Sequence, residues 1–160
     1  MLDWLESTSL GVWLRESPST WSFPMVITLH TTGMAVLVGA SFVLNLRLLG
    51  VGRHVPLSAF RWVFPTVAVG LTVNLVTGVL LFIKNATVWG VAVPFLIKMS
   101  LVVASVATLI PIRSLVVRDT AGPLPAAAPG AMPERVLAIA SLLAWSGAVT
   151  AGRLLAYIVV

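Results

Sequence analysis

Four long apolar runs, separated by breaks rich in proline, glycine and arginine, constrain the fold of this chain more than any other feature. Each run is close to the ~20 residues that a helix needs to cross ~30 Å of hydrocarbon. We expect membrane spans at about 21–46, 60–84, 91–112 and 135–160. With 59% hydrophobic and 9% charged residues and a mean hydropathy of +1.05, the chain cannot form a water-soluble globule. The sequence predicts an all-α integral membrane protein, a four-helix up-and-down bundle.

Composition also excludes several kinds of chemistry and partner. The chain contains no cysteine, which rules out disulfides, iron–sulfur clusters and thiolate metal sites. The net charge of +5 comes from basic residues beside apolar runs, where they act as topology determinants. We therefore expect a lipid bilayer as the surroundings and no binding of nucleic acid.

The arginines also predict the orientation, because loops rich in Lys and Arg resist translocation. One side of the predicted bundle carries two cations, Arg15 and Lys84. Their charge is partly offset by Asp3, Glu6 and Glu16 of the amino-terminal segment. The other side carries a much larger basic set, namely Arg47, Arg53, Arg61, Arg113, Arg118 and Arg135. We expect a multi-pass protein of the bacterial inner membrane with both termini in the periplasm.

The segments outside the spans differ in character. Residues 1–20 alternate apolar and polar side chains, which predicts one or two amphipathic helices lying in the headgroup region; a frayed tail that docks only on a partner is the alternative. The connections are expected at 47–59, 85–90 and 113–134. The stretch AGPLPAAAPG at 121–130 has too little bulky side chain to pack, so a mobile loop is expected there.

Three ionisable residues interrupt the apolar runs, and ionisable residues inside spans are candidates for function. Counted at ~1.5 Å per residue from the predicted span ends, His30, Lys98 and Arg153 all lie ~10 to 14 Å from the same surface. The matching level of the second span contains Asn74 and Thr77. Each has an ordinary explanation too: the cations can snorkel to headgroups, and the others can form hydrogen bonds within the bundle.

An imidazole with two cations at this depth fits a b-type haem. His30 is the predicted axial metal ligand, and Lys98 and Arg153 are the predicted partners of the propionates, with a quinone contact as an alternative for Lys98. Asn74 and Thr77 complete the predicted layer. Gly33 removes side-chain bulk near His30, which admits either a flat ring or a closely packed helix.

The second axial position is open. His54 lies on the cytoplasmic side, a full membrane thickness away, and is interpreted as a solvated loop residue. Met34 is one helical turn from His30 on the same face, so it cannot easily reach the opposite side of a ring. The sixth site is therefore empty, filled by Lys98, or supplied by a partner subunit.

Four motifs carry a resemblance to known proteins: WSFPMVITLHTTG at 21–33, LRLLGV at 46–51, TGVLLF at 77–82 and PFLIKM at 94–99. In these the chain resembles a group of small bacterial four-helix membrane proteins of unknown function. A histidine followed by glycine in a first span is, more loosely, similar to copper-resistance D-type and related b-type cytochrome membrane proteins. That similarity implies haem binding and electron transfer. This chain departs from a bis-histidine cytochrome in having a single histidine within its spans.

Three functional hypotheses follow. The first is a haem b subunit that transfers electrons between a periplasmic partner and the quinone pool, within a larger redox complex or a homo-oligomer. The second is a structural or assembly subunit whose cations bind lipid headgroups or a neighbour's carboxylates. The third, a small carrier, is disfavoured by the lack of repeats and broken helices. No carboxylate lies in a span and no hydrolase motif is present, which favours an accessory or electron-transfer subunit over an enzyme.

Overall fold

The computed structural model describes residues 2–120 and 132–158, and these residues form helices and no strand. Four long helices follow one another as α3 (Phe23–Leu49), α4 (Val63–Lys84), α6 (Val93–Thr120) and α7 (Met132–Ile158). The short elements are α1 (Asp3–Glu6), α2 (Ser9–Glu16), α5 (Ala86–Trp89) and the 3-10 turn η1 (Leu57–Phe60). The predicted all-α four-helix architecture is confirmed. The loop predicted to be mobile falls mostly on 121–131, outside the described residues.

All four long helices are apolar enough, over 23 to 28 residues, to cross a membrane. Their outward faces carry large hydrophobic side chains with high exposed fractions, for example Ile110 at 73%, Val103 at 69% and Leu143 at 68%. Such surfaces are unfavourable in water and suit a lipid bilayer. The protein is therefore a multi-pass membrane protein surrounded by lipid.

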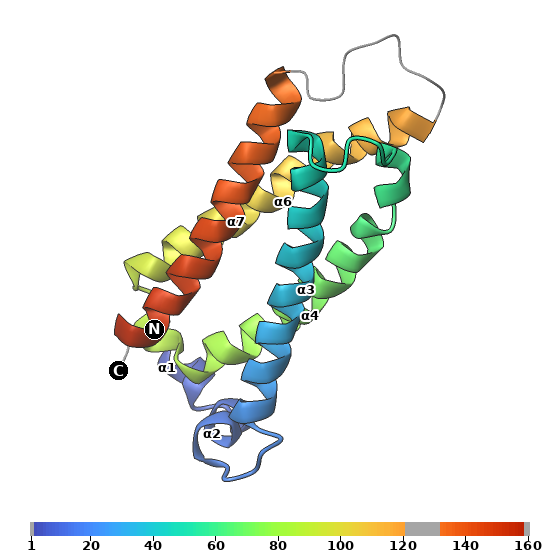
Figure 1. Cartoon of the computed structure of the whole chain (residues 1–160). Helices are drawn as coiled ribbons and strands as arrows, with labels where there is room; N and C mark the ends of the chain where they lie inside the picture. Colours follow the sequence, from blue (N-terminus) through green and yellow to red (C-terminus); the bar gives the residue numbers. More distant parts are fainter. Residues whose placement is uncertain (1, 121–131, 159–160) are drawn as a thin grey trace.

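The helices run up and down, and their contacts define an order across the bundle (Figure 1). Helix α4 packs on α3, α3 packs on α7, and α7 packs on α6, while η1 and the Phe82–Phe95 ring contact join α4 to α6 and close the bundle. Helices α1, α2 and α5 lie with the end of α7 at one end, which we call the N-terminal end. The opposite end, where α6 contacts η1, is the arginine-rich end.

Helix α6 extends eight residues beyond the predicted end of the third span. Pro111 lies inside it and lacks the N–H that would continue the hydrogen-bond ladder. Ile112 and Val116 are fully buried beyond the proline, and this packing holds the helix together to Thr120. The backbone N–H of Ser58 also donates to Asp119 at 2.9 Å. Arg113 and Arg118 consequently belong to a helix and not to a loop.

Helix α3 starts two residues later and ends three residues later than expected, and its end is well defined. Gly50, with φ 108°, terminates it by a Schellman arrangement in which Val51 N–H bonds the Leu46 carbonyl. Arg47 is only 6% exposed and donates to the carbonyls of Val55 and Arg53 at 2.7 and 3.2 Å. This arginine therefore fastens the following turn in addition to contributing to the charge asymmetry.

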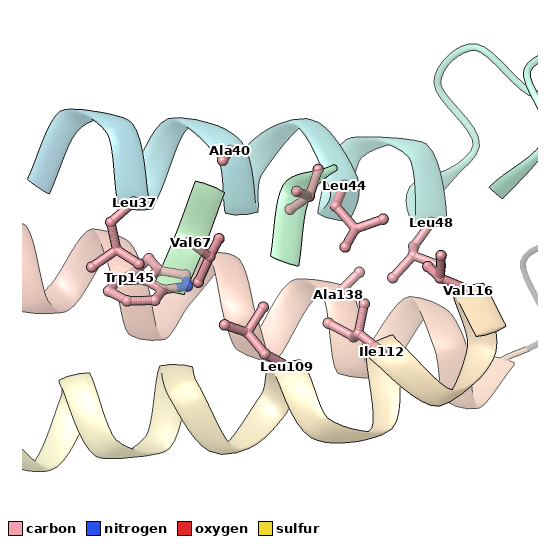
Figure 2. Close-up of a cluster of buried hydrophobic side chains, with 11 residues drawn as sticks. Leu37, Ala40, Leu44, Leu48, Val67, Leu109, Ile112, Val116, Ala138 and Trp145 are labelled. Carbon is pink, nitrogen blue, oxygen red and sulfur yellow. The ribbon is translucent and has the colours of Figure 1, made fainter. Parts of the chain in front are cut away.

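The arginine-rich half of the bundle contains the main cluster of buried hydrophobic side chains (Figure 2). Aliphatic side chains from all four long helices meet there, and the deeply buried Trp145 lies at one end of the cluster, beside Leu37 and Val67 (Figure 2). Asn45 on α3 donates to Ser141 on α7 at 3.0 Å, a buried bond between two fully buried side chains. Such polar pairs hold membrane helices together where the hydrophobic effect does not. The cluster consists of Leu37, Ala40, Leu44, Leu48, Val63, Val67, Leu109, Ile112, Val116, Ala138 and Trp145.

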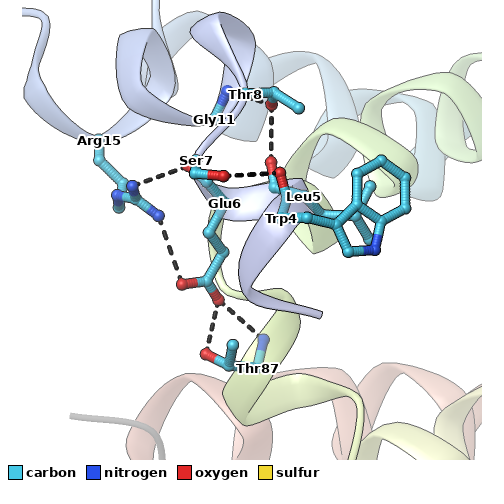
Figure 3. A network of polar contacts seen from close by, with 8 residues as sticks. All are labelled: Trp4, Leu5, Glu6, Ser7, Thr8, Gly11, Arg15 and Thr87. Carbon is cyan, nitrogen blue, oxygen red and sulfur yellow. Dashed lines mark hydrogen bonds and ion pairs between the residues drawn. The ribbon is translucent and has the colours of Figure 1, made fainter. Parts of the chain in front are cut away.

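The amino-terminal segment folds back onto the bundle (Figure 3). Thr8 begins α2 by accepting a hydrogen bond from Gly11 N–H at 3.1 Å. Glu6 accepts bonds from both the backbone N–H and the hydroxyl of Thr87, each at 2.7 Å, and pairs with Arg15 at 3.4 Å. The Thr87 bonds lower the pKa of the Glu6 carboxyl below its ordinary value. The two predicted helices are present, and they dock on α4 and α5 of the same chain.

Exposed tryptophans mark this end of the bundle. Trp4, Trp13 and Trp21 are 64%, 42% and 70% exposed, while Leu14 of the same segment is buried against Val26 and Leu81. Amphipathic indoles at helix ends are typical of the membrane–water interface. The segment therefore has one face on the bundle and one suited to lipid headgroups.

Candidate functional site

His30 makes one hydrogen bond across the contact between α3 and α4. Its Nδ1 lies 2.9 Å from the Thr77 hydroxyl oxygen. That hydroxyl also lies 2.6 Å from the Val73 carbonyl, four residues earlier, to which it donates its proton. The threonine oxygen therefore accepts from Nδ1–H, and the unprotonated nitrogen of the neutral ring is Nε2.

The Nε2 atom of His30 is buried and has no hydrogen-bond partner. A lone pair held in this way is costly in an apolar layer unless a ligand uses it. A histidine whose other nitrogen donates to a fixed acceptor has the arrangement seen in metal-ligating histidines. His30 is thus prepared to bind an electrophilic centre or to accept a proton from a ligand.

Glycines bring α3 and α4 close together beside this pair. A Cβ on Gly70 would lie 3.0 Å from the Gly33 carbonyl oxygen and 3.0 Å from the Leu37 nitrogen. A Cβ on Gly33 would lie 2.8 Å from the amide nitrogen of Asn74. Of the two uses predicted for Gly33, the structure therefore has close helix packing. Gly78 lies against His30, since its Cβ position is 3.4 Å from the ring.

A cavity of about 550 Å³ occupies the N-terminal half of the bundle, between all four long helices. Its size lies within the ~300 to 1,000 Å³ of ordinary small-molecule and cofactor sites. Aromatic rings form its outer wall, where Phe95 stacks with Phe82 and Trp89 at centroid distances of 5.2 and 6.3 Å. The polar groups that line it are His30, Asn74, Lys84, Asn85, Trp89, Lys98 and Trp145.

Two indoles in this wall have unused hydrogen-bond donors. The Nε1 atoms of Trp89 and Trp145 are buried without a partner, and Trp145 is only 2% exposed. Among the described residues the cavity wall contains no carboxylate, while two lysines contribute to it. The cavity therefore suits a ligand with oxygen acceptors or negative charge.

A second cavity of about 400 Å³ lies between α3 and α7. His30, Lys98 and Gly152 line both cavities, and Arg153 lines the second. The aliphatic stem of Lys98 rests on Gly152, whose Cβ position is 3.4 Å from the lysine Cε. His30 and Lys98 consequently stand between the two spaces.

The predicted layer of polar residues is thus largely brought together. His30, Lys98 and Arg153 share the wall of the second cavity, and Asn74 joins His30 and Lys98 in the first. Thr77 is buried behind His30 as its hydrogen-bond partner. Their use as a cofactor site stays a prediction.

The structure also locates the residues considered as second ligands. His54 is exposed in the turn after α3, at the arginine-rich end, in agreement with a solvated loop residue. Met34 lines both cavities on the same helix as His30.

Sequence reasoning missed Trp89, Trp145 and Lys84. The two tryptophans lie among apolar residues that give no sign of which ones face inward. Lys84 was interpreted only as a charge at a span end, yet its ammonium lies 3.7 Å above the Phe23 ring at the edge of the cavity. The tendency of buried indoles to seek acceptors was the available signal for the tryptophans.

Within the part of the chain that the structure describes, no group of three or more His, Cys, Asp or Glu residues could hold a metal ion. Comparison with protein-family models, curated proteins and solved structures finds no match to this chain. The resemblance to four-helix membrane proteins of unknown function therefore stays a prediction.

Proposed function

We propose that this protein is a membrane-embedded haem b subunit for electron transfer, with His30 as the axial ligand. One observation carries the proposal: the buried, unpartnered Nε2 of a ring whose Nδ1–H is held by Thr77. Haem iron is held in its ring by the porphyrin nitrogens, so the protein needs to supply an axial side chain and not a cluster of ligands.

The first cavity fits such a group in volume and chemistry. Its wall combines aromatic and aliphatic side chains with the ammonium groups of Lys98 and Lys84, which suit an apolar macrocycle with two anionic propionates. The free indole N–H groups of Trp89 and Trp145 supply further donors for oxygen atoms. Arg153, lining the neighbouring cavity, is proposed to add to the positive potential of this layer.

Each residue of the site has a defined part in this proposal. Bound haem would supply reversible one-electron storage. Thr77 holds the His30 ring in the tautomer whose Nε2 is free, and thereby also fixes the plane of the imidazole. Lys98 balances the negative charge of the propionates in a layer of low dielectric constant. The aromatic wall excludes water, which limits side reactions at the metal.

Charge asymmetry supports an orientation in the bacterial inner membrane with both termini in the periplasm. The arginine-rich end would face the cytoplasm under the positive-inside rule. The cavity in the N-terminal half would then lie near the periplasmic surface. We propose a periplasmic electron donor or acceptor there, with the quinone pool or a larger redox complex as the other partner.

Absorption spectroscopy tests the proposal. We expect the protein, purified from cells supplied with haem precursor, to show a Soret band that is lost in His30→Ala. His54→Ala is the matched control and should keep the band, because that ring is exposed at the other end of the bundle. A colourless wild-type protein, or an unchanged band in His30→Ala, would reject the haem assignment.

A structural or assembly subunit is the second candidate. Helices α4 and α6 expose large apolar side chains, among them Leu75 at 66% and Val103 at 69%, and these surfaces suit contact with another membrane subunit. Under this alternative the protein is colourless, and Lys98→Ala lowers its recovery with a partner subunit. Under the haem proposal, the same substitution shifts the reduction potential or lowers haem retention.

A further inference from the structure

The second cavity is a groove that results from the way α3 and α7 separate. The two helices are joined in the arginine-rich half by the buried Asn45–Ser141 hydrogen bond and by the core cluster. Towards the N-terminal end the space between them is filled less completely, and a volume of about 400 Å³ remains. The groove therefore begins where the close contact between α3 and α7 ends.

Small side chains give the groove its depth and length. Ala35, Gly39 and Gly152 lie in its wall, and a Cβ added to Gly39 would meet nothing within 4 Å. Along α3 the groove extends from Ile27 to Gly39, which lie twelve positions apart, or about 18 Å of helix at ~1.5 Å per residue. One leaflet contributes about half of the ~30 Å hydrocarbon layer, so the groove is about as long as one lipid chain.

A single exposed cation stands at the end of the groove nearest the membrane surface. Arg153 lines the groove and lies five residues before the end of α7 at Ile158, and Ile27, at the start of the groove, lies four residues after the beginning of α3 at Phe23. At this depth a guanidinium reaches phosphate oxygens, with which it forms charge-assisted bonds. Among the described residues the groove wall contains no carboxylate that would repel an anion.

From these observations we propose that the groove between α3 and α7 binds one anionic phospholipid of the leaflet at the N-terminal end. Its phosphate pairs with Arg153, and one acyl chain lies along α3 as far as Gly39. The length of the groove and the single cation at its mouth suit a chain with an anionic head, whereas the wider first cavity suits a flat ring. This proposal does not depend on haem.

The bound chain has a consequence for the neighbouring site. His30 and Lys98 form the wall that the two cavities share, so a lipid chain in the groove covers these side chains on the α7 side. The lipid therefore completes the apolar surroundings of the polar layer and excludes water from it.

Native mass spectrometry of the full chain, released from detergent after addition of phosphatidylglycerol or phosphatidylcholine, tests the proposal. We expect one retained phosphatidylglycerol in the wild type and weaker retention of phosphatidylcholine. Arg153→Gln should reduce the retained phosphatidylglycerol about fivefold, the effect of one cation beside an anionic headgroup. Arg135→Gln, an exposed arginine at the opposite end of α7, is the matched control and should change nothing.

A second variant separates recognition of the chain from recognition of the phosphate. Gly39→Leu fills open space in the groove, so it should lose both lipids while far-ultraviolet circular dichroism stays unchanged. Competition by millimolar inorganic phosphate should leave the lipid bound. Equal retention of the two lipids by the wild type, unchanged retention in Arg153→Gln or Gly39→Leu, or full displacement by phosphate would overturn the assignment. Because haem-free protein gives the same readout, a colourless protein would leave this proposal standing.

Discussion

Because α3 and α4 pack closely at Gly70 and not at Gly39, we expect Gly→Ala at these two positions to change the free energy of unfolding in opposite directions. In Gly70→Ala the new Cβ would lie 3.0 Å from the Gly33 carbonyl oxygen and from two atoms of Leu37. Ordinary contact begins at 3.4 Å, so α4 must move away from α3 by about 0.4 Å at atoms that are mostly backbone. Gly39→Ala, in the interior of α3, meets nothing within 4 Å.

The magnitudes follow from two opposing effects. Overpacking a close contact costs about 1–3 kcal/mol, whereas Ala in place of Gly within a helix gains up to about 1 kcal/mol. We therefore expect Gly70→Ala to lower the free energy of unfolding by up to about 2 kcal/mol. Gly39→Ala should leave it unchanged or raise it by up to about 1 kcal/mol.

Unfolding in mixed micelles with increasing sodium dodecyl sulfate, followed by near-ultraviolet circular dichroism, measures both variants. Gly70→Ala should unfold at a lower detergent fraction than the wild type, and Gly39→Ala at the same or a higher fraction. The same displacement acts on the His30–Thr77 hydrogen bond, which spans the same pair of helices. Equal effects of the two substitutions, or the reverse order, would refute the close α3–α4 contact.

Three further predictions concern individual polar contacts. Thr77→Val removes the acceptor of His30 Nδ1–H, so nitrogen chemical shifts of labelled histidine should show loss of the Nδ1-protonated tautomer. Thr77→Ser keeps the hydroxyl and should keep that tautomer. Retention of the Nδ1-protonated tautomer in Thr77→Val would contradict the hydrogen bond. Ser141→Ala leaves Asn45 without its partner and should lower the unfolding free energy by about 0.5–2 kcal/mol in the same assay, with exposed Ser114→Ala as a neutral control. The pKa of Glu6 is lowered from 4.5 by Thr87, so this contribution to docking of α1 and α2 is complete above about pH 4.5 and is lost as the pH falls through the lowered value. Proteolysis between α2 and α3 should therefore increase at low pH in the wild type, and Glu6→Ala should already be cleaved at neutral pH; equal cleavage of both at neutral pH would count against that contact.

Much of the fold could be predicted from the length of each apolar run, compared with the thickness of the hydrocarbon layer of a membrane. Each apolar run has to cross a layer of fixed thickness, and this fixes the number and the approximate ends of the spans. The extension of α6 past Pro111 could not be read in the same way, since it depends on burial of Ile112 and Val116 against other helices. Local rules for proline are overridden there by packing.

For the candidate site, the sequence predicts how far along each span a residue lies, but not which face of each helix points into the bundle. Counting residues from the span ends, at a nearly constant helical rise, predicted one level for His30, Lys98 and Arg153, and all three line the second cavity. The same count does not say which face each helix turns inward, since the spans are apolar on all sides. The inward positions of Trp145 and Trp89, and the use of Gly33 for packing, needed the helix contacts.

Ligation by His30 underlies the proposed function, and imidazole rescue is the sharpest test of it. His30→Gly removes the side chain and leaves a space beside Gly78 that free imidazole can enter. We predict that His30→Gly loses bound haem, and that added imidazole restores both the haem content and the wild-type absorption spectrum. Full haem content in His30→Gly without imidazole, or a wild-type protein that binds no haem at all, would contradict ligation by His30.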